Sequence, residues 1–193
     1  IYLRDSIGVF FQVVMEDPKT GEIDLSGASI QRPNEKTLEQ IVDEFAEKVS
    51  GVRVGTDEAL KTSRDLMSSV PAWAVSPLLR LTSFLSYTLN LDMRWAGMPN
   101  DLFGSVMITN VGSLGLPYAL VPLVPYSRVP LLLALGSIEE RAVVEGGQIV
   151  ARRVMDVGAT FDHRILDGGH AAKMQRIVRS WMEHPFEHFD ALD

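Results

Sequence analysis

Cysteine is absent from the 193-residue sequence. Its absence excludes disulfide bonds, zinc sites built on thiolates and a cysteine nucleophile, so any covalent or acid–base chemistry has to use other side chains. It also fits a reducing compartment. We therefore expect a cytoplasmic protein, or a mitochondrial-matrix protein if the source is a eukaryote.

Basic clusters are missing as well. The chain has 18 lysines and arginines against 25 aspartates and glutamates, which gives a net charge of −7, and the basic residues form no extended run. A nucleic-acid surface needs clustered cations to neutralise phosphates. The composition therefore excludes nucleic acid as a partner and indicates an acidic, solvated exterior.

The sequence also lacks a long unbroken apolar run. Its most apolar stretch, Pro71–Pro99, predicts one or two helices, and the longest of them, Leu78–Leu91, is interrupted by Arg80. Such a helix is shorter than the ~20 apolar residues that cross a bilayer. We interpret the stretch as a core or subunit-interface helix folded against protein. Membrane-surface contact and binding of an acyl chain are the alternatives.

The composition that is present suits one α/β domain over residues 1–193, because 46% hydrophobic residues in a chain of this length can build one sizeable core. The sequence begins at Ile1 with neither a methionine nor a charged-then-apolar leader. We interpret this start as a cut inside a longer protein, with the N-terminal part of the domain missing.

Hydrophobic patterns predict a mixture of strands and helices. Ile7–Met15 is a β-rich apolar run that predicts a strand buried on both faces, and Thr37-Leu38-Glu39-Gln40 matches a capping box that begins a helix ending near Val49. The further predicted elements are a helix over Thr56–Ser68, strands over 106–109, 131–135, 141–144, 149–151 and 153–160, a hairpin turn at Gly146-Gly147, and a last helix from Gly169 that ends before Pro185.

The strongest candidate for chemistry is His163, which ends a predicted strand and is followed at Asp167-Gly168-Gly169 by a turn into the last helix. A loop at a strand end can project an imidazole into a cleft, and a nearby carboxylate can hold the turn. Histidine and aspartate at this spacing form a weak motif by themselves. His184 and His188 flank Pro185 without a third ligand, so we expect no metal site.

The residues around His163 make the pattern specific. Thr160-Phe161-Asp162-His163-Arg164-Ile165-Leu166-Asp167-Gly168-Gly169-His170-Ala171-Ala172 closely resembles the active-site signature of dihydrolipoyl acyltransferases, the cores of 2-oxoacid dehydrogenase complexes, and of the related chloramphenicol acetyltransferases. Gly104–Gly115 resembles the second signature of that family, and Pro122–Arg141 resembles the stretch between the two. The resemblance is specific from residue 104 to about 184 and loose over residues 1–50.

The resemblance implies a chloramphenicol-acetyltransferase-like mixed sheet flanked by helices and assembled as a homotrimer, with larger shells in some relatives. It implies acyl transfer between thiols, coenzyme A and lipoamide or a similar thiol, in which His163 is the general base and the Thr109 hydroxyl stabilises the oxyanion. Asp167 would pair with an arginine that precedes Ile1 in the family. His163 of one subunit would face Thr109 of its neighbour.

Other interpretations stay open. A trimeric scaffold of the same fold could bind partners through Pro71–Pro99 without catalysis, although such a protein would be free to lose His163, Asp167 and Thr109. The acyl group and the acceptor thiol are not identified by the sequence. The lipoyl-bearing and partner-binding domains of the family are not in these 193 residues, and the long apolar stretch suggests a standalone or divergent branch.

Overall fold

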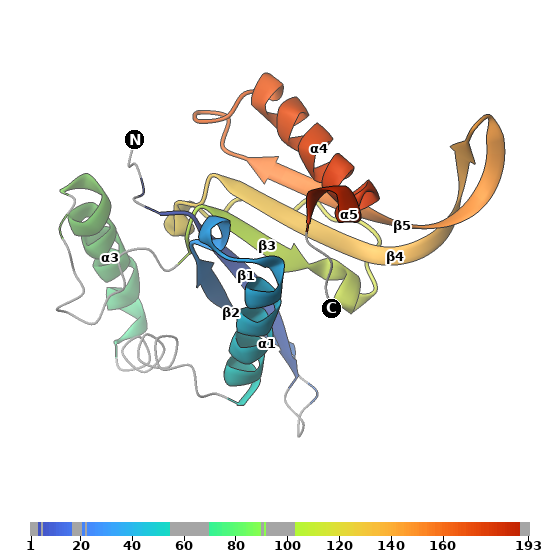
Figure 1. Cartoon of the computed structure of the whole chain (residues 1–193). Helices are drawn as coiled ribbons and strands as arrows, with labels where there is room; N and C mark the ends of the chain where they lie inside the picture. Colours follow the sequence, from blue (N-terminus) through green and yellow to red (C-terminus); the bar gives the residue numbers. More distant parts are fainter. Residues whose placement is uncertain are drawn as a thin grey trace.

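The chain forms an open five-stranded sheet with helices beside it (Figure 1). The computed structural model describes residues 4, 6–16, 21, 23–54, 70–89, 91 and 103–189. The strands are β1 (Gly8–Glu16), β2 (Ile23–Gln31), β3 (Val106–Asn110), β4 (Leu131–Glu145) and β5 (Gln148–Phe161). The helices are α1 (Leu38–Val54), α3 (Ala72–Ser83), which continues as a π-helical turn (Phe84–Thr88), α4 (Gly168–Glu183) and α5 (Pro185–His188), with short 3-10 turns at 33–35, 111–114 and 125–127.

The sheet is mixed, with strand order β2-β1-β3-β4-β5. The outer pairs β1–β2 and β4–β5 are antiparallel, whereas β1–β3 and β3–β4 are parallel. This arrangement confirms the expected α/β fold with a mixed sheet. The second signature contains β3, the short strand at the centre of the sheet. His163 comes after β5, which is an edge strand of the same sheet.

Two small cores lie on opposite faces of the sheet because successive strand residues point to opposite sides. Phe11 packs with β2 and with Val52 of α1, which covers one face. Phe10 packs on the other face, where the cluster also contains Met107, Val129 and Leu132 and the partly buried Phe103, Val121 and Leu123. The segment before β4 therefore covers the second face of the sheet, and the strand Ile7–Met15 is buried on both sides as predicted.

Helix α1 begins as its capping box predicts. The backbone N–H of Gln40 donates to the Thr37 hydroxyl at 3.3 Å, and the Thr37 N–H donates to the Gln40 side-chain oxygen at 3.1 Å. The helix extends to Val54, beyond the predicted end near Val49. The predicted helix over Thr56–Ser68 lies outside the described residues.

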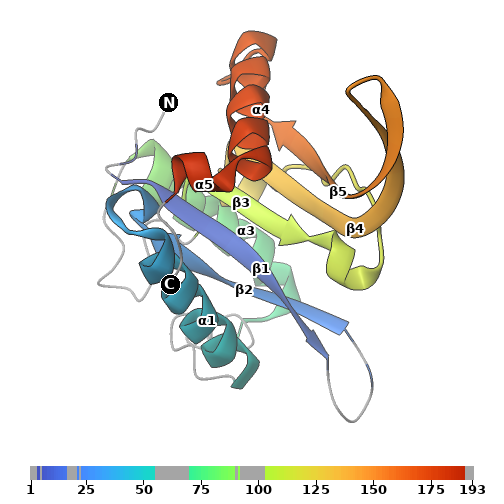
Figure 2. The ribbon, with the colours of Figure 1, turned by 45° about the vertical axis from the view of Figure 1, so that its right-hand side comes forward.

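The predicted strands after residue 105 join into longer ones. Residues 131–135 and 141–144 are one strand, β4, and residues 149–151 and 153–160 are one strand, β5. The pairing register of β4 and β5 shifts between Leu135 and Ile138. This shift interrupts the regular alternation of residues that would predict one continuous strand. Gly146 and Gly147 form the turn, with φ of 56° and 80°, as the hairpin prediction requires. Figures 1 and 2 show this hairpin curling away from the shorter strands.

Strand β2 was not predicted, because Gly27 and the small residues beside it, Ser26, Ala28 and Ser29, give a weak strand signal. In the structure a Cβ atom at Gly27 would lie 2.4 Å from Cζ of Phe10 on the neighbouring strand. The glycine that weakens the strand signal is therefore the residue that makes room for a core aromatic ring.

Residues 90 and 92–99 of the Pro71–Pro99 stretch lie outside the described residues. In the described part, α3 is not a core helix of the single chain, so the interpretation that stays a prediction is a subunit-interface helix. Helix α3 has no buried residue, and Trp73 is 81% exposed. Figure 1 shows α3 standing to one side of the sheet. Within the described part of the chain, no helix is both long and apolar enough to cross a membrane.

Candidate active site

The His163 turn is an extension of the β4–β5 pairing. Past the last paired residues, Leu131 and Phe161, the backbone N–H of Asp162 donates to the Pro130 carbonyl at 2.8 Å. The chain then reverses, and the N–H groups of Ile165 and Leu166 both donate to the Asp162 carbonyl, at 2.9 and 3.0 Å. His163 therefore lies at the exposed tip of a turn that is closed by backbone hydrogen bonds.

Asp162 and Arg164 clamp the turn on either side of His163. Arg164 Nη2 lies 2.6 Å from Asp162 Oδ2, and the Arg164 backbone N–H and Nε donate to Oδ1 at 3.0 and 2.9 Å. These hydrogen bonds from Arg164, its side chain first, lower the pKa of Asp162 from 3.8 to about 2. Asp162 is therefore a charged structural anchor near neutral pH, and its pairing with Arg164 holds the turn on which His163 is exposed.

Asp167 lies where α4 begins. Its Oδ1 accepts the backbone N–H of His170 at 2.9 Å, and His170 Nδ1 lies 2.7 Å from the same oxygen. The Asp167 backbone N–H in turn donates to His170 Nδ1 at 3.4 Å, which completes a capping box. The His170 backbone hydrogen bond is the main cause of the lowered pKa of Asp167, and the His170 side chain adds to it. Asp167 thus fixes the end of the His163 turn by capping the helix, and His170 lies in the first turn of that helix.

Thr109 belongs to the second signature and lies on β3, the central strand of the sheet. It is 8% exposed on β3, and Asn110 follows it as the cap of a 3-10 turn, its side-chain oxygen accepting the Ser113 N–H at 3.1 Å. A Cβ atom on Gly112 would lie 2.5 Å from the backbone of Gly136 in β4, so only glycine lets this turn approach the neighbouring strand. The Asn- and Gly-containing pattern therefore holds the strand end at which Thr109 lies.

One chain does not bring His163 and Thr109 together. Thr109 pairs with Ala134 of β4, which pairs with Gly158 of β5, whereas His163 follows Phe161. Phe161 lies three residues beyond Gly158 along β5, which is about 10 Å along the sheet, and two strand spacings add about 10 Å across it. The two side chains are therefore far beyond hydrogen-bond reach of each other within a subunit.

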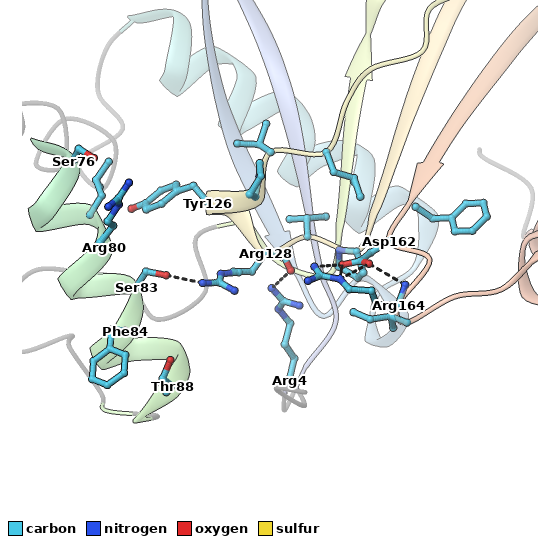
Figure 3. A pocket seen from close by; sticks show the side chains of 18 of the residues that line it. Arg4, Ser76, Arg80, Ser83, Phe84, Thr88, Tyr126, Arg128, Asp162 and Arg164 are labelled. Carbon is cyan, nitrogen blue, oxygen red and sulfur yellow. Dashed lines mark hydrogen bonds and ion pairs between the residues drawn. The ribbon is translucent and has the colours of Figure 1, made fainter.

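A cleft of about 1400 Å³ opens beside His163 (Figure 3). One wall is α3 and the π-helical turn after it, and the other is made by residues 123–130 together with the His163 turn. Figure 3 shows Arg80 and Ser83 on the helix side, with Arg4 and Arg128 between the helix and the Asp162–Arg164 pair. Thr109 is not among the residues that line this cleft.

The cleft differs in charge from the rest of the molecule. Among the described residues, its lining contains the four arginines Arg4, Arg80, Arg128 and Arg164 and one carboxylate, Asp162, whereas the whole chain has a net charge of −7. Local positive charge in a concave site concentrates anionic ligands. The cleft is therefore suited to a ligand that carries negative charge.

Residues 125–130 supply contacts that the sequence did not reveal. Arg128 has φ of 55°, an uncommon conformation for a residue with a side chain, and its Nη2 donates to the Ser83 hydroxyl at 3.0 Å. Arg128 also accepts, through its carbonyl, a hydrogen bond from Arg4 Nη2 at 3.3 Å. The buried Ser127 hydroxyl donates to the Val124 carbonyl at 2.8 Å and accepts the Val129 N–H at 3.3 Å. The only signal in the sequence was the place of this segment between the two signatures.

No group of three or more histidines, aspartates and glutamates that could hold a metal ion occurs among the residues that the structure describes. His188 Nε2 lies 3.0 Å from the Ser180 hydroxyl, and His184 Nδ1 lies 4.0 Å from a Glu187 oxygen.

Known proteins are similar to this chain in sequence and in fold. Residues 98–189 match the profile of the family described as 2-oxoacid dehydrogenases acyltransferase (catalytic domain). The lipoamide acyltransferase component of the branched-chain alpha-keto acid dehydrogenase complex of Pseudomonas aeruginosa is 36% identical over 86 residues, which are 44% of this chain and 20% of that protein. The mitochondrial component of the same name from Bos taurus is 24% identical over 173 residues, 83% of this chain and 34% of that protein.

A solved structure described as a probable dihydrolipoamide acetyltransferase from Listeria monocytogenes superposes with a TM-score of 0.65 at 19% identity, covering 98% of this chain and 61% of that one. This likeness establishes a shared fold over almost the whole chain. The chain spans about a fifth of the length of the curated Pseudomonas relative that it matches.

Proposed function

Because residues 98–189 match the profile of the 2-oxoacid dehydrogenases acyltransferase family, we propose that this chain transfers an acyl group between two thiols, coenzyme A and lipoamide or a similar thiol. The observation that carries the proposal is His163, the exposed residue at the tip of a turn held by backbone hydrogen bonds and by the Asp162–Arg164 clamp, beside a large cleft with an excess of arginines. Residues 1–193 would form one catalytic domain.

The chemistry assigned to His163 is removal of the acceptor's proton. A free thiol has a pKa of about 8.5, so near neutral pH most of it is protonated and a base is needed to form the attacking thiolate. The thiolate would attack the thioester carbonyl and form a tetrahedral oxyanion. Expulsion of the second sulfur, which takes the proton from the His163 imidazolium, completes the exchange without an acyl-enzyme.

Thr109 would donate its hydroxyl hydrogen to the oxyanion, from a neighbouring subunit. The separation of Thr109 and His163 within one chain supports this arrangement, because a single subunit leaves the two groups in different parts of the sheet. We therefore propose a homotrimer with an active site at each subunit boundary, able to enter a larger assembly. Light scattering should give three chains per particle, and a monodisperse monomer would contradict the assembly.

Asp167 would act by holding the turn and not by moving protons. Its carboxylate is occupied by the N-terminus of α4, and its lowered pKa keeps it charged near neutral pH. The additional pairing with an arginine from before Ile1 remains a proposal from the family resemblance.

The test is acyl exchange between a panel of acyl-coenzyme A thioesters and dihydrolipoamide. Removing a general base costs about a hundredfold to ten-thousandfold in rate, so His163→Ala should lose activity by that factor while its melting temperature stays within a few degrees of wild type. His184→Ala removes another exposed histidine and is the matched control. Equal activity of His163→Ala and wild type would refute the catalytic assignment.

A trimeric scaffold without catalysis is the second candidate, and the exposed apolar surface of α3 favours it, because such surface commonly marks a binding site. A wild-type trimer that is inactive on every thioester and thiol pair would support the scaffold over the enzyme.

A further inference from the structure

His170 is a second histidine in the signature around His163, and the proposed mechanism gives it no role. It lies in the first turn of α4, with 63% of its side chain exposed. Its ring contacts Asp167, the residue that caps the helix. His170 therefore lies where the His163 turn passes into α4, in contact with the residue that ends the turn.

The two ends of the His163 turn are held differently. At the start, Asp162 pairs with Arg164 and is hydrogen-bonded through both its backbone N–H and its carbonyl. At the end, Asp167 is followed by Gly168 and Gly169, the first two residues of α4. Glycine is the residue with the most backbone freedom, so these two positions do little to fix the direction of the chain. The end of the turn therefore depends on the side-chain contacts between Asp167 and the helix.

The ring nitrogen Nδ1 of His170 lies close to two polar groups of Asp167. It is 2.7 Å from the carboxylate oxygen Oδ1 and 3.4 Å from the backbone nitrogen. A protonated Nδ1 donates to the carboxylate, whereas an unprotonated Nδ1 accepts the backbone N–H. A capping box usually has glutamate or glutamine at this position. With histidine here, the ring is hydrogen-bonded to Asp167 in either protonation state of Nδ1.

From these contacts we infer that His170 is a positioning residue for the transfer of the acyl group. It holds Asp167 in place and so fixes the direction in which the turn presents the His163 imidazole. The inference rests on the proposed acyl transfer. His170 acts through Asp167 and needs no contact with either thiol. Because displacing a reacting group by about 1 Å can cost about a hundredfold in rate, loosening the end of the turn should slow the reaction.

Two other roles for His170 make different predictions. A contact that served stability alone would matter little, because exposed charged pairs contribute little to the free energy of unfolding. His170→Ala would also keep the backbone N–H that donates to the Asp167 carboxylate, so part of the cap remains. A second base would have to exchange a proton with the substrate, and no amide side chain could replace it. A residue that positions the turn can be replaced by a side chain that makes the same hydrogen bond.

The experiment compares acyl exchange by the assembled wild-type protein and three variants, with the panel of acyl-coenzyme A thioesters and dihydrolipoamide. His170→Ala should lower kcat about tenfold to a hundredfold, with KM and melting temperature nearly unchanged. His170→Gln should recover most of kcat, because its side-chain oxygen can accept the Asp167 N–H. Lys173→Ala is the matched control, because Lys173 is an exposed residue one turn further along α4, and its kcat should equal that of wild type.

The pH dependence of kcat gives a second measurement. His170→Gln should keep the acid limb of the wild-type profile, because His163 is still the base. Loss of that limb would make His170 a base and overturn the inference. A His170→Gln variant as slow as His170→Ala would also overturn it, and so would a His170→Ala variant with wild-type kcat.

Hydrogen exchange of residues 162–170 separates this inference from the proposed function. Faster exchange in His170→Ala than in Lys173→Ala supports the hold on the turn even if wild type transfers no acyl group, and then the proposed transfer alone fails. Equal exchange in the two variants would show that His170 does not fix the turn, and the inference would be wrong whether or not the protein is active.

Discussion

The two walls of the cleft are built in different ways. The wall on the sheet side is held by backbone hydrogen bonds from Asp162 to Pro130, by the buried Ser127 and by the packing of Val129 and Leu132 in the core. The wall on the helix side, α3, has no buried residue. The proposed base, His163, therefore lies on a wall that is held by hydrogen bonds and core packing within the chain. The opposite wall, α3, is exposed in a single chain.

The first test of this difference compares truncations in the two walls. Leu132 is 3% exposed in the core under the sheet-side wall, so Leu132→Ala should cost about 2–5 kcal/mol of unfolding free energy. Leu81→Ala on α3, where the side chain is 54% exposed, should change it by less than about 0.5 kcal/mol. Urea denaturation at one protein concentration measures both. Similar costs would mean that α3 is buried in the assembled protein.

The second test separates catalysis from folding within the sheet-side half. Thr109→Ala should lower kcat by about a hundredfold to a thousandfold if its hydroxyl is the oxyanion donor, which corresponds to about 2.7–4 kcal/mol of transition-state stabilisation. Thr109→Ser keeps a hydroxyl and is the control. Acyl-exchange kinetics beside thermal melts decide the result. An active Thr109→Ala variant would remove Thr109 from the mechanism.

The third test concerns the turn that aims His163. Asp167→Ala removes the cap of α4 and should cost about 0.5–2 kcal/mol of stability together with loss of activity, because the end of the His163 turn is released. Asp167→Ser can still cap the helix and should recover most of the stability. Melting temperature and kcat are measured on both. If Asp167→Ala loses activity without any loss of stability, the carboxylate has a role beyond capping.

The smallest expected effect is the response of the turn to acid. Arg164 lowers the pKa of Asp162 from 3.8 to about 2, so the pair stabilises the folded chain fully above pH 3.8, and the contribution is lost as the pH falls toward 2. The difference in melting temperature between wild type and Arg164→Gln should therefore be constant above pH 3.8 and shrink below it. A difference that grows on acidification would have the wrong sign for this pair.

Local signals in the sequence predicted much of the fold. The capping box at Thr37, the glycine turn at 146–147 and the end of the last helix before Pro185 all occur as predicted, because each depends on a few neighbouring residues. Strand β2 and the joining of β4 and β5 across their register shift were missed, since both depend on partners far away in the chain.

In the candidate site, too, the features that depend on neighbouring residues were predicted and those that depend on distant residues were not. The sequence by itself predicted a strand that leads to His163 and a turn at Asp167 before the last helix, because these signals lie in consecutive residues. The structure ends the strand at Phe161, has His163 in the turn, and shows that Asp167 caps the helix. Only the tertiary structure decided that Thr109 lies far from His163 in one chain, and that arginines at positions 4, 80, 128 and 164 line one cleft. These groups are separated by up to 160 positions in the sequence, and no local pattern records the strand pairings and chain path that bring them to a common surface.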